Sequence, residues 1–176
     1  ENDIDAFIEG NAIPEKAEEV KEAIKENKEF SEMIVNPIML KDLITIIECG
    51  KPIPEDIEEL SEVYLETIIN REIDEKKDQL ASYINGALTY MVKQAITTKD
   101  GKEIDWTSNA PTSYFKVIDI FYDYAKENNI DLENFDAERL LSLIKKMGIL
   151  KEVEFQKYAF SDEKFFHIYY YNAISN

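Results

Sequence analysis

The chain of 176 residues carries 37 acidic and 20 basic side chains, which gives a formal net charge of −17 at pH 7. Hydrophobic residues make up 44% of the chain, a share typical of a folded protein and too high for a disordered one. A surface with this negative charge repels phosphate backbones and anionic lipid headgroups. We therefore expect neither a nucleic acid nor a membrane as a partner. A basic protein partner is compatible with this charge.

The cysteine content points to a reducing, cytoplasmic compartment. Cys49 is the one cysteine of the chain, so no disulfide framework can form. It lies in an apolar helical run and is expected to pack as a small hydrophobe, with a catalytic thiol as the alternative. No apolar run approaches the ~18 residues that a membrane-spanning helix needs.

The first half of the chain is predicted to be helical throughout. Apolar spacing indicates helices over residues 4–7, 15–27, 29–35, 38–49, 54–75 and 78–96. Pro14, Pro37 and Pro54 suit the first turns of helices, and Gly50 is typical of a C-terminal stop. Residues 38–49 are apolar nearly all round, which is typical of a buried helix. We therefore expect a helical bundle domain over residues 1–97.

The last third is predicted to form a second, winged-helix-like domain over residues 98–176. A loop near residues 98–112, with a short strand over 102–106, marks the boundary. A helix over residues 114–128 precedes a second over 137–147, which Asp136 caps and Gly148 ends. Residues 150–161 alternate apolar and polar side chains, which predicts a β-hairpin with its turn near Gln156 and Lys157. With an aromatic helix over 163–175, the whole chain is expected to be mainly α.

The chain lacks the residues that several kinds of catalytic site require. The five glycines do not occur in the spacing of a phosphate-binding loop, and one Cys with one His cannot build a zinc site. A catalytic triad would have to use His167, which lies in a crowded aromatic helix and is expected to pack there. Acidic pairs such as Glu58 and Glu59 are typical of a solvated helix face. We therefore expect no catalytic residue, metal or cofactor in this chain, and no enzyme activity of its own.

The C-terminal helix carries a cluster of aromatic side chains that ring most of its circumference. One face is expected to pack in the winged-helix core, and the rest to meet another domain or form an interface. Core packing and docking both stay open at this point. The cluster consists of Phe165, Phe166, Tyr169, Tyr170 and Tyr171.

Winged-helix units often bind DNA through the second of these helices. Here that helix offers Arg139, Lys145 and Lys146, but the acidic field of the chain opposes DNA binding.

Several short motifs, taken in order, resemble the region that follows the nucleotide-binding domain in STAND-type NTPases, the NACHT and related signalling ATPases. Residues 36–44 read Asn-Pro-Ile-Met-Leu-Lys-Asp-Leu-Ile, residues 50–54 Gly-Lys-Pro-Ile-Pro, and residues 59–64 Glu-Leu-Ser-Glu-Val-Tyr. Near the end, Gly-Ile-Leu at 148–150, a hairpin, Tyr-Ala-Phe at 158–160 and an aromatic helix resemble the close of the family's winged-helix domain. The resemblance covers about residues 7–175.

The resemblance implies a regulatory segment without hydrolytic activity. Its phosphate-binding loop and acidic metal-binding strand would lie upstream of residue 1, in a parent protein that binds ATP or ADP with Mg. Asn36 and Pro37 would lie near the adenine. The family's phosphate-sensing histidine falls by spacing on Asp162, and His167 comes five residues later. Either His167 substitutes in a shifted register, or this protein lacks that sensor.

The leading hypothesis is therefore a non-catalytic segment of a signalling or defence NTPase that relays nucleotide state by domain rearrangement. Its partners would be the upstream nucleotide-binding domain, other protein domains and, in the parent, further copies. The rival is a stand-alone acidic adaptor that binds proteins through its aromatic C-terminal helix, and a third hypothesis is a DNA-binding regulator.

Overall fold

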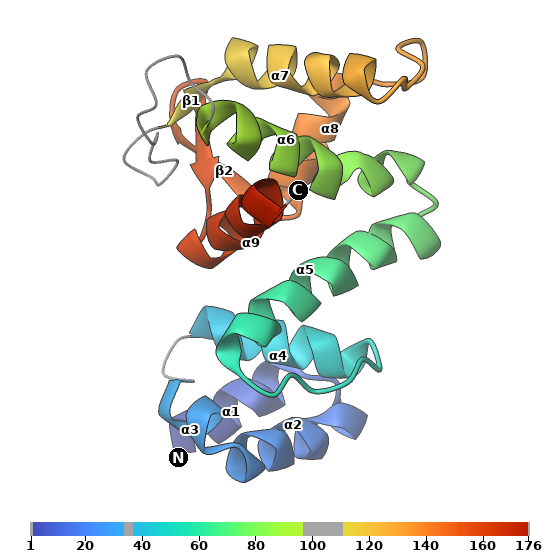
Figure 1. Cartoon of the computed structure of the whole chain (residues 1–176). Coiled ribbons are helices and arrows are strands. Elements are labelled where there is room, and N and C mark those ends of the chain that lie inside the picture. The colour runs from blue at the N-terminus through green and yellow to red at the C-terminus, as the bar shows by residue number, and fades with distance from the viewer. Residues whose placement is uncertain (1, 34–36, 97–110, 176) are drawn as a thin grey trace. The chain divides into compact units, whose positions relative to one another are not determined.

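The structure, a computed structural model, describes residues 2–33, 37–96 and 111–175. It is mainly helical with a small antiparallel sheet, which confirms the predicted fold class (Figure 1). The chain divides into two compact units, residues 1–68 (unit 1) and residues 69–176 (unit 2). The division falls within helix α5 (Ile57–Asp74).

Unit 1 is a helical bundle. It contains α1 (Asn2–Asn11), α2 (Pro14–Glu26), α3 (Lys28–Met33), α4 (Pro37–Glu48) and the first part of α5. Helix α2 packs against α1, α3 and α4, and α1 also contacts α4. The core between these helices is apolar, and its most deeply buried members include Ile8, Val20, Phe30, Leu43, Ile46, Ile47 and Leu60.

The predicted start and stop signals of unit 1 are largely confirmed. Pro14 and Pro37 are the first residues of α2 and α4, where a missing N–H costs nothing. Gly50 follows α4 with φ of 69°, the left-handed conformation that glycine adopts without a steric penalty. The prediction was wrong at Pro54, because α5 begins three residues later, at Ile57.

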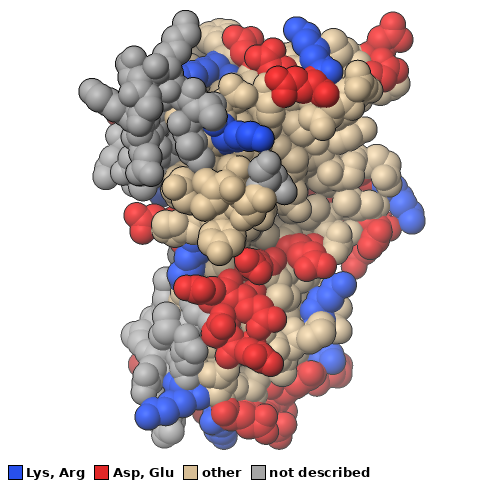
Figure 2. Space-filling model, in the orientation of Figure 1, with Lys and Arg blue, Asp and Glu red and all other residues tan. Residues whose placement is uncertain are grey.

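The two units differ strongly in charge. Residues 1–68 contain 19 acidic and six basic side chains, so 13 of the 17 net negative charges belong to unit 1. Figure 2 shows acidic side chains gathered on the face of unit 1 that it draws. Unit 2 is therefore the less negative of the two.

Unit 2 has the element order of a winged-helix unit. The 3₁₀ helix η1 (Gln79–Tyr83) leads into α6 (Ile84–Ile96), and β1 (Thr112–Ser113) leads into α7 (Tyr114–Glu127) and α8 (Ala137–Lys146). The hairpin β2 (Leu150–Glu154) and β3 (Lys157–Phe160) is followed by α9 (Glu163–Ser175). The antiparallel sheet has the order β1-β3-β2, with Thr112 opposite Tyr158.

The hairpin turns at Phe155 and Gln156, one residue earlier than predicted. Gln156 has φ of 55° and takes the left-handed position that glycine usually fills. The strand register shifts between Glu152 and Glu154, so a bulge accommodates the turn. The carbonyl of Gln156 accepts a hydrogen bond of 2.8 Å from the N–H of Tyr114, which ties the turn to the start of α7.

Helix α6 packs with the C-terminal elements. It contacts both α7 and α9, and its Ala87, Leu88, Met91 and Val92 are almost completely buried. The predicted domain boundary near residues 98–112 and the predicted strand over 102–106 fall mostly or wholly outside the described residues, so both stay predictions. Among the described residues, the compact units divide earlier, at residues 68 and 69.

We predict that Gly86→Ala destabilises unit 2, although alanine is the better helix former. A Cβ at position 86 in α6 would lie 2.2 Å from the hydroxyl oxygen of Tyr124, so the Tyr124 ring would have to move. We expect a loss of about 1 kcal/mol in the free energy of unfolding, measured by urea titration. In a Tyr124→Ala background the clash is absent, and the same change should stabilise by about 0.5–1 kcal/mol.

The matched control is Gly10→Ala in α1, where an added Cβ meets no atom within 4 Å. We expect that change to be neutral or stabilising. A stabilising effect of Gly86→Ala in the otherwise unchanged chain would contradict the predicted clash.

Candidate functional site

Helix α8 exposes a polar face in unit 2. Leu140, Leu141 and Ile144 face the core, so the opposite side of the helix is exposed. The Asp136 carboxylate accepts a 3.0 Å hydrogen bond from the N–H of Arg139, which confirms the predicted cap. The exposed positions are Glu138, Arg139, Ser142, Lys145 and Lys146.

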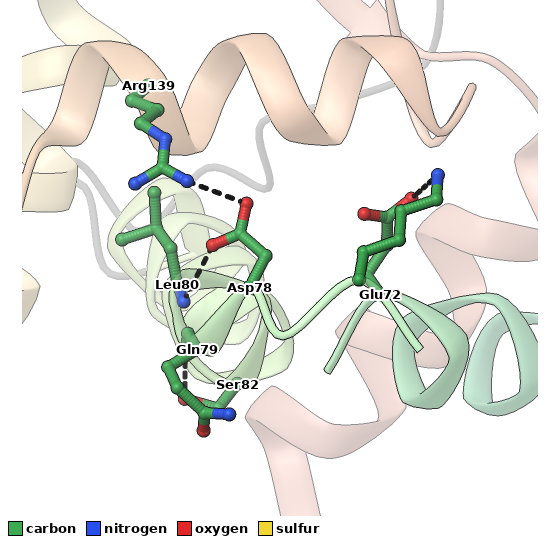
Figure 3. Close-up of polar contacts among 7 residues, drawn as sticks. Glu72, Asp78, Gln79, Leu80, Ser82 and Arg139 are labelled. Atoms are coloured by element: carbon green, nitrogen blue, oxygen red, sulfur yellow. Dashed lines mark hydrogen bonds and ion pairs between the residues drawn. The ribbon is translucent and has the colours of Figure 1, made fainter. Parts of the chain in front are cut away.

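Arg139 is paired within the unit. Its guanidinium Nη2 lies 2.9 Å from Oδ2 of Asp78, which precedes η1 (Figure 3). The other carboxylate oxygen of Asp78 accepts the N–H of Leu80 and so caps η1. The Arg139 side chain is 61% exposed, so the pair contributes at most about 1 kcal/mol. Its effect is to neutralise one of the charges that α8 would offer to DNA.

Lys145 is paired as well, and an aromatic ring lies beneath it. Its ammonium nitrogen lies 3.2 Å from Oε2 of Glu152 on β2 and 5.7 Å from the ring centroid of Tyr158 on β3. The N–H of Gln156 and the Lys145 ammonium lower the pKa of Glu152 below its ordinary value, so this carboxylate is an anion at neutral pH. The basic residues Arg139 and Lys145 therefore both face carboxylates of their own unit.

A hollow of about 370 Å³ lies on this side of α8. Two tyrosines form its aromatic wall: the Tyr114 and Tyr158 rings have centroids 6.3 Å apart at an interplanar angle of 48°. Burial and the nearby Glu138 carboxylate raise the pKa of Tyr114. The remaining lining residues are Asp136, Glu138, Arg139, Leu141, Ser142 and Lys145.

The buried side of α9 holds two of the five predicted cluster residues. Phe165 and Tyr169 are 7% and 1% exposed and pack in the core of unit 2. The Tyr169 ring stacks on Phe160, with centroids 5.7 Å apart, and its hydroxyl donates a 2.9 Å hydrogen bond to Oδ1 of Asn85 on α6. These two residues hold α9 in place.

The other three cluster residues lie toward the outside. Phe166 and Tyr170 are half-buried and contact each other, with ring centroids 5.8 Å apart. Tyr171 is 69% exposed, and Ile174, one helical turn further, is 54% exposed. The aromatic cluster thus divides into a packing side and an exposed side: core packing is confirmed for Phe165 and Tyr169, and docking stays a prediction for the other three residues.

The residues expected near nucleotide lie in both units. Pro37 is exposed at the start of α4 in unit 1, and Asn36 lies outside the described residues. In unit 2, the Asp162 carboxylate accepts a 2.9 Å hydrogen bond from the N–H of Lys164 and caps α9. The expectation that His167 packs within this helix was wrong, because it points away from the buried side of α9 and is exposed, beside the Phe166 ring. Within unit 2, Asp162 and His167 therefore occupy successive turns of one helix.

A second hollow, of about 400 Å³, lies between α6, α7 and α9. Its lining includes Gly86, Tyr90 and Tyr124. The Tyr90 hydroxyl donates a 3.0 Å hydrogen bond to Oε1 of Glu127, and burial together with this carboxylate raises the pKa of Tyr90 to about 12. Its described lining includes Lys93 but no carboxylate or histidine.

The partners of the α8 face are not apparent from the sequence. Asp78, Tyr114, Glu152 and Tyr158 lie outside α8 and carry no spacing that links them to it. Cys49, expected to be a core residue, is half-buried. Within the described ranges, no group of three or more His, Cys, Asp and Glu side chains is placed to hold a metal ion. Likewise, none of the described helices combines the length and apolarity needed to cross a membrane.

Comparison with known proteins finds no matching family model, no similar curated protein and no similar solved structure. Function must therefore be argued from the residues and their arrangement.

We predict that Tyr169→Phe lowers the free energy of unfolding by about 0.5–1.5 kcal/mol, because the hydrogen bond to Asn85 is lost while the buried ring stays. Tyr171→Phe is the matched control, since it removes the same hydroxyl from an exposed ring two residues along the helix. Urea titration measures both. Equal effects of the two changes would contradict the role given to Tyr169.

We predict that Asp162→Ala destabilises the chain by about 1 kcal/mol, because the N-terminal turn of α9 loses its cap. Asp162→Ser should keep most of that stability, since a serine hydroxyl also caps a helix. Thermal unfolding of the three proteins makes the comparison. If Ser and Ala behave alike, the Asp162 carboxylate does not act as a cap.

Proposed function

We propose that this chain is a non-catalytic regulatory segment of a STAND-type signalling or defence NTPase. In this role it relays the nucleotide state of an upstream ATPase domain by domain rearrangement. The observation that carries the proposal is the order of its parts: a helical unit, then a unit in which α6, β1, α7, α8 and the β2–β3 hairpin follow the winged-helix order. That order accompanies the sequence motifs at residues 36–64 and 148–160.

The start of α4 supports the proposal. Pro37 is exposed at the first position of an otherwise largely buried helix, so a ligand or a neighbouring domain has access to it. A proline at this position also has a fixed φ, which gives the chain a rigid entry into α4. In the proposed parent protein this residue contacts the adenine of bound ATP or ADP.

The α8 face supports a regulatory role over DNA binding. Arg139 and Lys145 are both neutralised by carboxylates, and the face also carries Glu138 and Asp136. Phosphate contacts need cations that can replace counterions of the nucleic acid. We therefore propose that unit 2 uses its winged-helix frame for contacts with protein.

Phosphate sensing is not assigned to Asp162. Its carboxylate caps α9, and an anion there would repel the β-phosphate of a nucleotide. His167 lies on the exposed side of the same helix and can donate a hydrogen bond outward. In the proposed parent protein, His167 is therefore the better candidate for contact with the nucleotide-binding domain.

The second candidate function is a stand-alone acidic adaptor, and the exposed side of α9 favours it. Tyr171 and Ile174 are large, apolar and exposed on adjacent turns, which is typical of a docking surface. The two candidates differ in what precedes the chain, since an adaptor needs no ATPase domain.

The complete reading frame of the gene discriminates between them. We expect it to encode a phosphate-binding loop and an acidic metal-binding strand upstream of the codon for residue 1. A start codon directly before that codon would overturn the NTPase proposal and leave the adaptor.

In the complete protein, we predict that Pro37→Ala weakens ADP binding about fivefold, through loss of the contact with adenine. A fluorescent ADP analogue measures the affinity. Pro14→Ala is the matched control, because Pro14 is the exposed first residue of α2 and the change affects helix entry in the same way. Equal affinities of the two variants would contradict the placement of Pro37 near nucleotide.

A further inference from the structure

The α8 face contains a cation-binding site, and the chain's own Lys145 occupies it. The Lys145 ammonium lies over the Tyr158 ring at 5.7 Å and beside the Glu152 carboxylate at 3.2 Å. An aromatic face and a carboxylate are the two groups that bind ammonium and guanidinium ions most favourably. Lys145 is 48% exposed, so an incoming side chain can displace it into solvent.

The Glu152 carboxylate that holds this charge is fixed in position. Its Oε1 accepts a 3.0 Å hydrogen bond from the N–H of Gln156, and the Tyr158 hydroxyl approaches Oε2 at 3.5 Å. The Gln156 carbonyl in turn accepts the N–H of Tyr114. The turn of the hairpin therefore holds the anion and the aromatic wall in one frame, and binding a cation there requires little reordering.

The hollow beside Lys145 also combines aromatic rings with a carboxylate. Its volume of about 370 Å³ exceeds that of one arginine side chain, and Glu138 lines it together with Tyr114 and Tyr158. A second positive group entering the hollow would meet an anion and a ring together.

Exposed apolar side chains adjoin this place along the chain. Phe155 at the hairpin turn is 85% exposed, and Phe115, directly after Tyr114, is 69% exposed. The Tyr114–Gln156 hydrogen bond joins the two segments that carry them. Such rings bury readily against the aliphatic residues of a partner, and large aromatics contribute strongly to interfaces.

We propose that the face formed by Tyr114, Glu138, Glu152 and Tyr158 docks a basic segment of a partner protein, with an arginine or lysine replacing Lys145 over the Tyr158 ring. Apolar residues next to that basic residue pack on Phe115 and Phe155. The Glu138 and Glu152 carboxylates on this face favour the approach of such a segment. This inference goes beyond the proposed NTPase association, and its outcome does not depend on the upstream reading frame.

The test compares two neighbouring lysines. The probe is a fluorescein-labelled ten-residue peptide with two arginines among leucine and serine residues, titrated with the whole chain and followed by anisotropy at 0.15 M salt. Lys145→Ala empties the place over Tyr158, and Lys146→Ala removes the same charge from the next exposed residue. We expect Lys145→Ala to bind the peptide about fivefold more tightly than Lys146→Ala.

A pair of acidic changes tests the hollow. Glu138→Gln and Glu163→Gln each remove one negative charge from an exposed helical position in unit 2. We expect about fivefold weaker binding for Glu138→Gln and less than a twofold change for Glu163→Gln. The pairing of variants is needed because the strongly acidic unit 1 attracts any basic peptide, and that background is the same for both members of a pair.

Three results would overturn the proposal. The first is equal affinity within both pairs, which would mean non-specific attraction by net charge. The second is equal binding of a peptide whose arginines are replaced by glutamine. The third is tighter binding of duplex DNA than of the basic peptide at the same salt. Thermal unfolding of each variant verifies that it is folded, and Tyr114→Phe, which keeps the ring, should bind better than Tyr114→Leu.

Discussion

The burial of α6 is the constraint on which unit 2 depends. This helix packs against α7 on one side and α9 on another, so its small residues set how closely its neighbours approach. Ala87 is completely buried, and Gly86 leaves the space that the Tyr124 ring occupies. Helix α7 in turn contacts α8 and β1, and α9 contacts β3. A boundary drawn after residue 97 would separate α6 from the elements that bury it.

Charge pairing decides what the α8 face offers to other molecules. From its sequence alone, a helix with Arg139, Lys145 and Lys146 resembles the recognition helix of a nucleic-acid-binding protein. The fold brings Asp78 to Arg139 and Glu152 to Lys145, from η1 and β2 respectively. The charges are then balanced locally, and the aromatic rings of Tyr114 and Tyr158 become the distinctive feature of the face.

Local signals made much of the helical fold predictable. Pro14, Pro37, Gly50, Asp136 and Gly148 act on the residues next to them, so their effects on helix ends follow from sequence. Strand β1 was missed because two residues show no periodicity, and its pairing with β3 depends on contacts 45 or so positions away. The ion pair of Arg139 with Asp78 is also long-range, joining residues 61 positions apart.

The candidate site was less predictable than the fold, for a related reason. In α9 the aromatic residues surround the helix, so no helical periodicity separates the core side from the surface side. Tyr169 and Tyr171 look equivalent in sequence, yet one is 1% and the other 69% exposed. Tyr169 contacts Phe160 on β3 and Asn85 on α6, and no local sequence pattern predicts these contacts.

The contact between Tyr169 and Asn85 also affects the order of events during synthesis. These residues lie 84 positions apart, and Tyr169 belongs to the last helix of the described chain. Unit 1 is built from contacts among the first 68 residues, so its core can assemble early on the ribosome. Helix α6 must wait for α9, and until then its apolar surface is open to chaperones and to aggregation.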